Sequence, residues 1–389
     1  MKLLRFLLVF PALFFVAFLR FSPFKIRLGV LMADRIGHLA GNTEVYLCEK
    51  EAGLQKGFDI WGHFKPANDY LLKMWKRVMR IDSTGFLIIV MKVNRLFPNW
   101  QSYEINAGNY DRDVNNLFEK SPPHLTFTEE EKARGEAGLR KLGIPKGAKW
   151  VCLIVRDSAY LPELGYHAYR DSDINDYGPA AVSLAKQGYY VLRMGAKVNK
   201  PWPKFHSKVI DYASNHRSEF MDIYLGANCE FCISTGCGFD AIPYIFRRPI
   251  VYVNFAPLEY LFTFRPSLAI WKHHYRNGKR MTVKEIADSG AGRFMMKEEF
   301  EEAGITLKDN TPEEIKEVVM EMASGLSTTP QDQFWADFPR SLSMVGKPLH
   351  GEIRMRIGQK FLERYDPLPE LYQSHDDDFS QWERGFHAS

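Results

Sequence analysis

Residues 231–254 read FCISTGCGFDAIPYIFRRPIVYVN and decide the fold, because they follow the order strand, glycine turn, short helix, strand. The run Phe231 to Ile233 is too short for a helix core and is rich in aromatic and branched residues, as buried strands are. Gly236 and Gly238 allow a sharp turn, since neither carries a Cβ atom. The stretch therefore predicts a βαβ unit.

The glycine turn of this unit is a candidate phosphate site. Pro243 falls in the first turn of the short helix, where amide hydrogens lack partners within the helix. Such amides attract anions by about 0.3–1 kcal/mol at exposed positions. The alternative is a tight turn without a ligand, in which hydroxyls only cap the backbone. The residues assigned to the anion site are Ser234, Thr235, Gly236, Gly238 and, as the helix cap, Asp240.

Length and composition indicate a globular protein of two domains. With 389 residues the chain is longer than the usual domain with a single hydrophobic core. Ligands often bind in the cleft between two domains. The net charge of +4 is small and no basic stretch with interleaved aromatics stands out, so nucleic acid is not an expected partner. Five scattered cysteines favour a reducing compartment without a disulfide framework.

The N-terminal segment is unusually apolar. Residues 6–19 carry no charge and are flanked by basic residues on both sides. The run is shorter than the roughly 20 residues that cross a bilayer, Pro11 interrupts it, and no small-x-small cleavage pattern follows. We expect residues 1–27 to be a retained membrane-associating segment that dips into an anionic leaflet or makes one marginal span. A buried helix is the alternative.

Residues 28–127 are expected to form a first Rossmann-like domain. A short apolar run at 28–32 reads as a strand and is followed by a turn and a helical pattern, and 58–61 and 86–93 read as further strands. Residues 128–149 hold a charged helix and a glycine turn, which we interpret as a linker.

Residues 150–325 alternate strands and helices, which predicts a parallel doubly wound sheet in a C-terminal Rossmann-like domain. Thr311, followed by proline and two glutamates, marks the start of a helix over 312–323. Residues 326–389 form a C-terminal extension. The expected fold class is therefore α/β, with two Rossmann-like domains facing a central cleft.

Five sequence runs stand out, DRIGHL from Asp34, VRDSAYL from Val155, YRD from Tyr169, GYYVLRMG from Gly188 and ISTGCGFD from Ile233. Together they resemble a family of bacterial glycosyltransferases that are associated with surface-polysaccharide gene clusters, and the resemblance extends from Arg27 to Ala323. It implies a GT-B fold, with the acceptor on residues 28–127 and a nucleotide-sugar donor, as co-substrate, on residues 150–325. No cofactor is expected.

Sugar transfer requires a group that stabilises the departing diphosphate. Arg156, Arg193 and Lys197 each follow a predicted strand, and the carboxyl ends of parallel strands meet at the ligand-binding edge of a sheet. Arginine binds phosphate through two parallel hydrogen bonds, so a metal is not required. The alternative for each of these cations is a solvated surface charge.

Transfer also requires a base that takes the acceptor proton. His38 and Asp34 follow the first strand, and Glu44 lies on the helix after it. Histidine, with an ordinary pKa near 6.5, suits general-base work, which contributes about 10²–10⁴-fold. A purely structural histidine is the alternative. Arg35 could bind an acceptor phosphate or pair with Glu44.

Three sequence patterns are also found in metal sites or lipid-binding sites. Cys229, Cys232 and Cys237 lack a fourth ligand, and the Asp-x-Asp triplets at 111–113 and 171–173 lie away from the expected first-domain strand end, so no metal site is expected. The basic run 272–280 is expected to be a solvated loop, with lipid headgroups or a lipid-linked diphosphate as the alternative partner.

These observations predict a metal-independent glycosyltransferase that moves a sugar from a nucleotide-sugar to an envelope polysaccharide or a lipid-linked glycan. It is expected in the cytoplasm, peripherally associated with the inner membrane or anchored in it. The alternatives are a nucleotide-sugar epimerase on the same fold and a non-catalytic glycan- or nucleotide-binding partner in an assembly complex.

Overall fold

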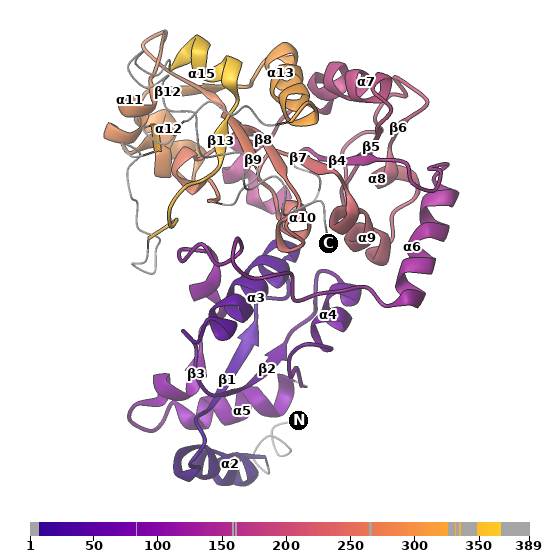
Figure 1. Ribbon diagram of the computed structural model, residues 1–389. Helices are drawn as coiled ribbons and strands as arrows, with labels where there is room; N and C mark the ends of the chain where they lie inside the picture. The colour runs from indigo at the N-terminus through magenta and orange to yellow at the C-terminus, as the bar shows by residue number, and fades with distance from the viewer. Residues whose placement is uncertain are drawn as a thin grey trace, which may run out of the picture. The chain divides into compact units, whose positions relative to one another are not determined.

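The computed structural model is an α/β protein with parallel sheets, so the predicted fold class is confirmed (Figure 1). It describes residues 8–82, 84–157, 159, 162–263, 267–325, 331, 334–335 and 348–366. Most of the predicted extension 326–389 therefore lies outside the described residues. The chain forms two compact units: unit 1 is Met1–Gly147, His216–Glu230 and Cys237–Arg248, and unit 2 is Ala148–Asn215, Phe231–Gly236 and Pro249–Ser389.

Unit 1 contains a three-stranded sheet in the order β2-β1-β3. The central strand β1 (Ile26–Leu31) pairs in parallel with β2 (Phe58–His63) and with β3 (Glu104–Ile105). Almost every residue of β1 is buried, because parallel strands are covered on both faces. The helix α3 (Ile36–Glu51) follows β1 after a short turn, and α4 (Asp69–Trp75) follows β2.

The stretch 86–93, predicted as a strand, lies within the helix α5 (Thr84–Asn94), so that prediction is wrong. The buried residues of α5 recur at helical spacing and place one face against its neighbours. A short apolar run cannot be assigned to strand or helix by composition alone. The buried residues are Leu87, Val90, Met91, Val93 and Asn94.

Part of the apolar N-terminal segment forms the helix α2 (Val9–Phe21). Residues 1–7 of the chain lie outside the described part. Ala12, Val16 and Leu19 of α2 are buried in one cluster with the apolar side chains of α5. Among the helices that the structure describes, none is both long enough and apolar enough to cross a membrane. The 13 residues of α2 compare with the roughly 20 that a bilayer requires.

Unit 1 also takes in helices from later parts of the sequence. The helix α6 (Glu129–Lys141), predicted as part of a linker, starts with a capping box between Thr128 and Glu131 and packs on α9 (Glu219–Asn228). A Cβ atom at Gly135 would lie only 2.1 Å from the Tyr224 ring, so this glycine lets the two helices approach. The short helix α10 (Ala241–Ile245) packs on α9 and on α3. The predicted C-terminal domain thus supplies two helices to unit 1.

Unit 2 contains a seven-stranded sheet in the order β13-β9-β8-β7-β4-β5-β6, with every pair parallel. From β4 to β9 the spatial order is that of a nucleotide-binding Rossmann sheet, 3-2-1-4-5-6, and it reverses between β4 and β7. Ligands of such sheets bind beyond the carboxyl ends of the strands at this switch point. The strands are β4 (Trp150–Ile154), β5 (Tyr190–Arg193), β6 (Val209–Ile210), β7 (Phe231–Ser234), β8 (Ile250–Phe255), β9 (Ser267–Trp271) and β13 (Arg356–Ile357).

The helix α13 (Pro312–Ala323) has the predicted bounds and begins with a capping box between Thr311 and Glu314. It packs beside α7 (Gly178–Lys186) on one side of the seven-stranded sheet (Figure 1). Further α-helices of unit 2 are α8 (Tyr212–Asn215), α11 (Val283–Asp288), α12 (Lys297–Glu302) and α15 (Gln359–Tyr365).

The basic run 272–280 is not a solvated loop, and this prediction is wrong. Lys272, His273 and His274 are only 3%, 6% and 0% exposed. The Lys272 ammonium lies 2.7 Å from the carboxylate of Asp309, so its charge is neutralised within the fold and is not presented to lipid headgroups. The strands concerned are β10 (His273–Arg276), β11 (Lys279–Arg280) and β12 (Ile305–Lys308), which form an antiparallel sheet.

Candidate functional site

The turn after β7 is closed by its own hydrogen bonds. Ser234 and Thr235 are fully buried. Ser234 Oγ accepts a hydrogen bond from the Gly236 amide at 2.9 Å, and Thr235 Oγ1 accepts one from the Arg156 amide at 2.9 Å. Both hydroxyls therefore hold loop backbone, which is the alternative that the sequence left open for them.

The amides that follow are also engaged. The Cys237 amide donates to Asp240 Oδ2 at 2.9 Å, and Asp240 is buried. The Gly236 and Cys237 amides are thus bonded within the turn and are not offered to a phosphate. Gly236 has φ +76°, and a Cβ atom there would approach the Phe255 ring to 2.7 Å, so side-chain packing covers the bend. The turn is a tightly packed structural element.

Gly238 has a different role, because it lets two backbone segments of unit 1 meet. A Cβ atom at Gly238 would lie 3.3 Å from the amide nitrogen of Gly37, in the first turn of α3, and one at Gly37 would lie 3.0 Å from the Gly238 Cα atom. Gly238 itself is exposed. The contact brings this part of the turn beside the end of β1, where the sequence places Asp34 and His38.

The first turn of α3 orients a histidine. His38 Nδ1 lies 3.3 Å from Asn42 Oδ1, and Asn42 Nδ2 donates to the Ala107 carbonyl at 3.0 Å. Because that bond fixes the amide orientation, Asn42 Oδ1 is an acceptor toward the ring, and the hydrogen-bond network assigns the hydrogen of the neutral ring to Nδ1. Nε2 of His38 then keeps its lone pair, as a general base requires.

The electrostatic surroundings of His38 favour the neutral ring. Burial lowers the pKa of His38 from its ordinary value of 6.5; the hydrogen bond to Asn42 opposes this shift and the Arg35 charge adds to it. His38 is half-buried, whereas Asp34 and Arg35 are exposed. Two of the three predicted catalytic residues thus lie at one strand end with access to solvent.

Glu44, the third predicted catalytic residue, lies in a buried ion pair. It is fully buried, and Arg247 Nη2 donates to its Oε1 at 2.7 Å. Glu44, Cys48 and His124 offer ligand atoms within 4.8 Å of one another, as a metal site would. However, the Arg247 guanidinium contacts both the Glu44 carboxylate and, at 3.5 Å, the Cys48 sulfur, so a cation already fills this position. A substrate hydroxyl cannot reach this carboxylate.

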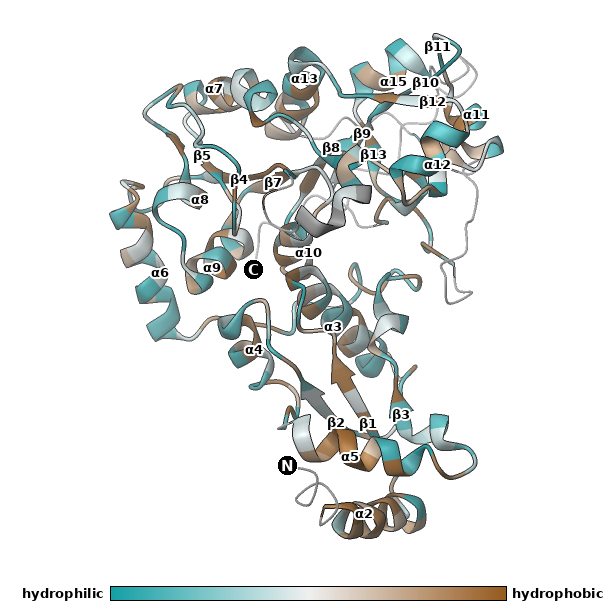
Figure 2. Ribbon diagram, turned by 180° about the vertical axis from the view of Figure 1, so that it is seen from behind, coloured by the Kyte–Doolittle hydropathy of each residue, from teal (hydrophilic) through white to brown (hydrophobic). Residues whose placement is uncertain are grey.

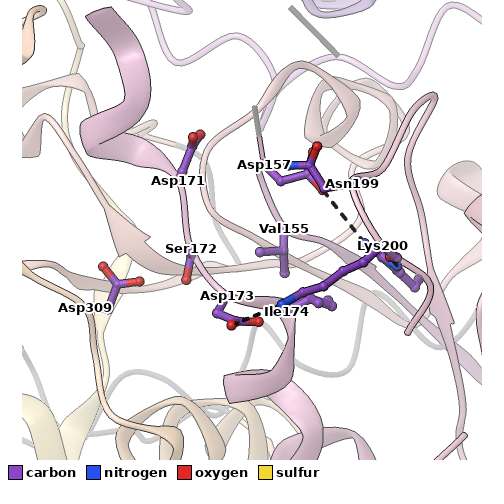
Figure 3. A pocket seen from close by; sticks show the side chains of 10 residues that line it. Val155, Asp157, Asp171, Ser172, Asp173, Ile174, Asn199, Lys200 and Asp309 are labelled. Atoms are coloured by element: carbon purple, nitrogen blue, oxygen red, sulfur yellow. Dashed lines mark hydrogen bonds and ion pairs between the residues drawn. The ribbon is translucent and has the colours of Figure 1, made fainter. Parts of the chain in front are cut away.

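Unit 2 contains a cavity of about 400 Å³ beyond the carboxyl ends of β4 and β5 (Figure 3). It therefore lies at the edge of the sheet where Rossmann folds bind their ligands. Its walls come from the ends of these strands, from the loop after β5, from the segment before α7 and from the residue after β12. The lining residues are Val155, Asp157, Asp171, Ser172, Asp173, Ile174, Arg193, Asn199, Lys200 and Asp309.

Arg193 lines this cavity but is largely occupied by protein groups. Its side chain is 4% exposed and lies 3.8 Å from the Asp157 carboxylate and 3.6 Å from that of Asp211. Arg193 Nη1 donates to the Lys200 carbonyl at 2.6 Å, which holds the loop after β5. Lys197 is exposed in that loop, and the side chain of Lys200 is 56% exposed at the cavity.

Two arginines hold the loops at the strand switch point. Arg156 Nε lies 3.2 Å from the Asp171 carboxylate. The Arg170 guanidinium donates to the Gly236 carbonyl. Arg170 and Asp171 belong to the YRD run that the sequence singled out, but neither was assigned to the site. Other residues that sequence reasoning missed are Asn42, Asp157, Asp173, Asn199, Lys200 and Asp309, and the Asp-x-Asp triplet at 171–173 was the available signal.

The charge of the cavity wall restricts what it can bind. Four carboxylates line it against two cationic side chains, Arg193 and Lys200. Ionised carboxylates only accept hydrogen bonds, so they suit the hydroxyls of a sugar or ribose better than phosphate oxygens. Phosphate groups are better placed at the rim, where the two lysines of the loop after β5 are exposed.

No protein-family model and no curated protein sequence matches the chain. It is similar to the solved structure of a glycosyl transferase family 9 protein from Veillonella parvula, with 10% identity over 70% of this chain and 90% of that one and a TM-score of 0.40. The ADP-heptose LPS heptosyltransferase II of E. coli has 12% identity, coverages of 71% and 97% and a TM-score of 0.40. The E. coli heptosyltransferase WaaC, solved with ADP-2-deoxy-2-fluoro heptose, has 12% identity, coverages of 68% and 100% and a TM-score of 0.29.

These three similar structures are all glycosyltransferases, as is the family that the sequence motifs resemble. Their identities and TM-scores are low, so the chemistry of this chain depends on its own residues. The relevant features are the oriented histidine in unit 1 and the carboxylate-lined cavity in unit 2.

Proposed function

We propose that this protein is a glycosyltransferase that moves a sugar from a nucleotide-sugar donor to a hydroxyl group of an envelope polysaccharide or a lipid-linked glycan. The observation that carries the proposal is His38, which Asn42 holds with a free Nε2 at the end of β1. The Rossmann strand order of unit 2 and its cavity support a nucleotide-sugar as donor.

In the proposed reaction, His38 Nε2 removes the proton of the acceptor hydroxyl as its oxygen attacks the anomeric carbon of the donor. A bond forms between these two atoms, and the bond from the anomeric carbon to the diphosphate oxygen breaks. The diphosphate leaves with the electron pair, and the proton remains on His38. Asp34, exposed beside His38, is the second candidate for the base. Glu44 is not part of this proposal, because Arg247 holds it in a buried pair.

The donor would place its hydroxyls against the carboxylates of the cavity and its diphosphate against Lys197 and Lys200 at the rim. Arg193 then acts indirectly, since it holds the Lys200 carbonyl. Arg156 lies at the switch point, where it can reach a phosphate by exchanging its contact with Asp171. Ser234, Thr235, Gly236 and Asp240 shape this strand end, and Gly238 keeps the turn beside α3.

Fixed cations can neutralise a departing diphosphate, so the proposed reaction needs no metal. The proposed setting is the cytoplasmic face of the inner membrane, where nucleotide-sugars and lipid-linked glycans meet. A membrane-associated protein would find such an acceptor at the surface to which it is bound.

The test is a donor screen on the purified protein. Nucleoside diphosphates and their sugars are compared by thermal shift, and the free diphosphate is then measured with and without a glycan or lipid-linked acceptor, in EDTA. We expect stabilisation by at least one nucleotide and release of diphosphate that depends on acceptor and persists in EDTA. Conversion of the donor to an epimer, without acceptor, would replace this function by an epimerase. Binding without any turnover would support a non-catalytic partner instead.

A further inference from the structure

Exposed apolar side chains are concentrated on one part of unit 1. Of the fourteen large hydrophobic side chains that are exposed in the described part of the chain, eight lie on α2, just after it, or in the loop after α5. Several are almost fully accessible, with Phe14 at 79%, Phe21 at 88% and Leu96 at 80%. We name this set the phenylalanine face; it consists of Phe10, Leu13, Phe14, Phe18, Phe21, Phe24, Leu96 and Phe97.

The phenylalanine face is a consequence of helical spacing. The exposed rings of Phe10, Phe14, Phe18 and Phe21 recur every three or four residues and form one stripe along α2. The opposite stripe packs on α5 in the core of unit 1. Figure 2 shows α2 as a predominantly hydrophobic helix. The helix α2 is apolar on two sides, but only one side is packed against the protein. The exposed apolar side is therefore available to a binding partner.

The loop after α5 is fixed beside α2 by Arg20. Arg20 Nη1 donates to the Pro98 carbonyl at 3.1 Å, and Nη2 donates to Asn94 Oδ1 at 3.1 Å. The same guanidinium lies 5.0 Å from the centre of the Phe97 ring. Leu96 and Phe97 are therefore held next to the C-terminal end of α2, and the two segments make one surface.

The segments that build this surface contain no acidic residue. Residues 1–33 and 84–103 carry seven lysines and arginines and no aspartate or glutamate. Of these cations, Lys25 and Lys92 are exposed in the described residues, and Arg95 is exposed but paired with Glu104 at 2.8 Å, just beyond the second segment. An apolar face bordered by cations is complementary to a bilayer that contains anionic lipids, where rings enter the acyl boundary and cations meet headgroups.

We infer that the phenylalanine face docks on an anionic lipid bilayer, with α2 lying in the plane of the interface. A second copy of this chain is a poorer partner, because a symmetric interface would set the cations of one copy against those of the other. This inference is independent of the sugar-transfer reaction and can succeed or fail without it.

The test measures co-sedimentation of the full chain with phosphatidylcholine vesicles, with and without phosphatidylglycerol. We expect binding to the anionic vesicles that weakens as salt rises. The double variant Phe14→Glu, Phe21→Glu should bind at least roughly 100-fold more weakly, because two apolar rings leave the acyl boundary and two carboxylates face anionic headgroups. The milder double variant Phe14→Ser, Phe21→Ser should also bind the vesicles more weakly than the parent chain. Its thermal unfolding temperature should equal that of the parent.

Phe64→Ser and Phe205→Ser are the matched controls, since these rings are 60% and 42% exposed but lie outside the phenylalanine face. Both should bind vesicles like the parent chain. The inference is overturned if the serine double variant binds as well as the parent, or if binding is equal with neutral vesicles and insensitive to salt. It is also overturned if light scattering shows a dimer that the double variant converts to a monomer while vesicles are ignored.

Discussion

The turns that follow β1 and β7 each lie between a buried strand and a helix and have a glycine close by, Gly37 in the first turn of α3 and Gly236 in the β7 turn, yet they differ in how their polar atoms are used. After β7, the amides of Gly236 and Cys237 and the hydroxyl oxygens of Ser234 and Thr235 are all engaged inside the fold. After β1, Asp34 is exposed and His38 is held by only one of its ring nitrogens. A glycine near a strand end therefore indicates a tight turn but not a ligand site. We expect the chemistry at the β1 turn, where polar atoms still face solvent.

The largest expected effect is on turnover at the β1 turn. His38→Gln should lower kcat by about 10²–10⁴-fold, the usual contribution of a general base, and leave donor affinity unchanged. Initial rates of diphosphate release and donor titrations measure the two quantities. His63→Gln, a half-buried histidine at the end of β2, is the matched control and should leave both unchanged. Parent-like turnover in His38→Gln would transfer the role to Asp34.

At the β7 turn a substitution should affect stability. Gly236→Ala is expected to lower the free energy of unfolding by about 2–4 kcal/mol, from the positive φ and from the clash with Phe255. Gly143→Ala is the control, because Gly143 has φ +75° and a methyl group added there would meet no heavy atom within 4 Å. Urea unfolding of the two variants separates backbone strain from packing. Equal losses would show that Phe255 does not cover the turn.

A smaller effect at the β1 turn should appear in the pH profile. His38 must be neutral to act as a base, so activity should fall as pH drops through its lowered pKa, below 6.5. The hydrogen bond to Asn42 raises that pKa, so Asn42→Ala should move the acid limb to lower pH and Asn42→Asp to higher pH. Loss of the bond should reduce kcat roughly two- to tenfold. Identical limbs in all three proteins would show that His38 does not set the profile.

The smallest expected effect concerns the rim of the cavity. Lys200→Ala should weaken donor binding by up to about fivefold, since an exposed charge contributes about 1 kcal/mol or less. Lys186→Ala, an exposed lysine on α7, is the control and should bind donor like the parent. Isothermal titration at low and high salt measures both. A parent-like constant for Lys200→Ala would place the diphosphate elsewhere.

Much of the fold could be predicted because local patterns agreed with it. The capped helix at Thr311, the buried strand of residues 150–154 and the βαβ order after residue 231 are all specified by neighbouring residues. The stretch 86–93 could not be assigned, because a short apolar run fits a buried strand or one helix face equally well. The burial of Lys272 could not be found, since its partner Asp309 is distant in sequence.

For the site, the sequence by itself determined that His38 and Asp34 follow a strand and that arginines follow other strands, because these are facts of chain order. Only the tertiary structure decided which of them are available. Glu44 is neutralised by Arg247, 203 residues away in the sequence, and Asn42 orients His38 because the Ala107 carbonyl fixes its amide. Such pairings depend on side chains that meet only when the chain is folded, and burial then decides which charges and lone pairs remain free to react.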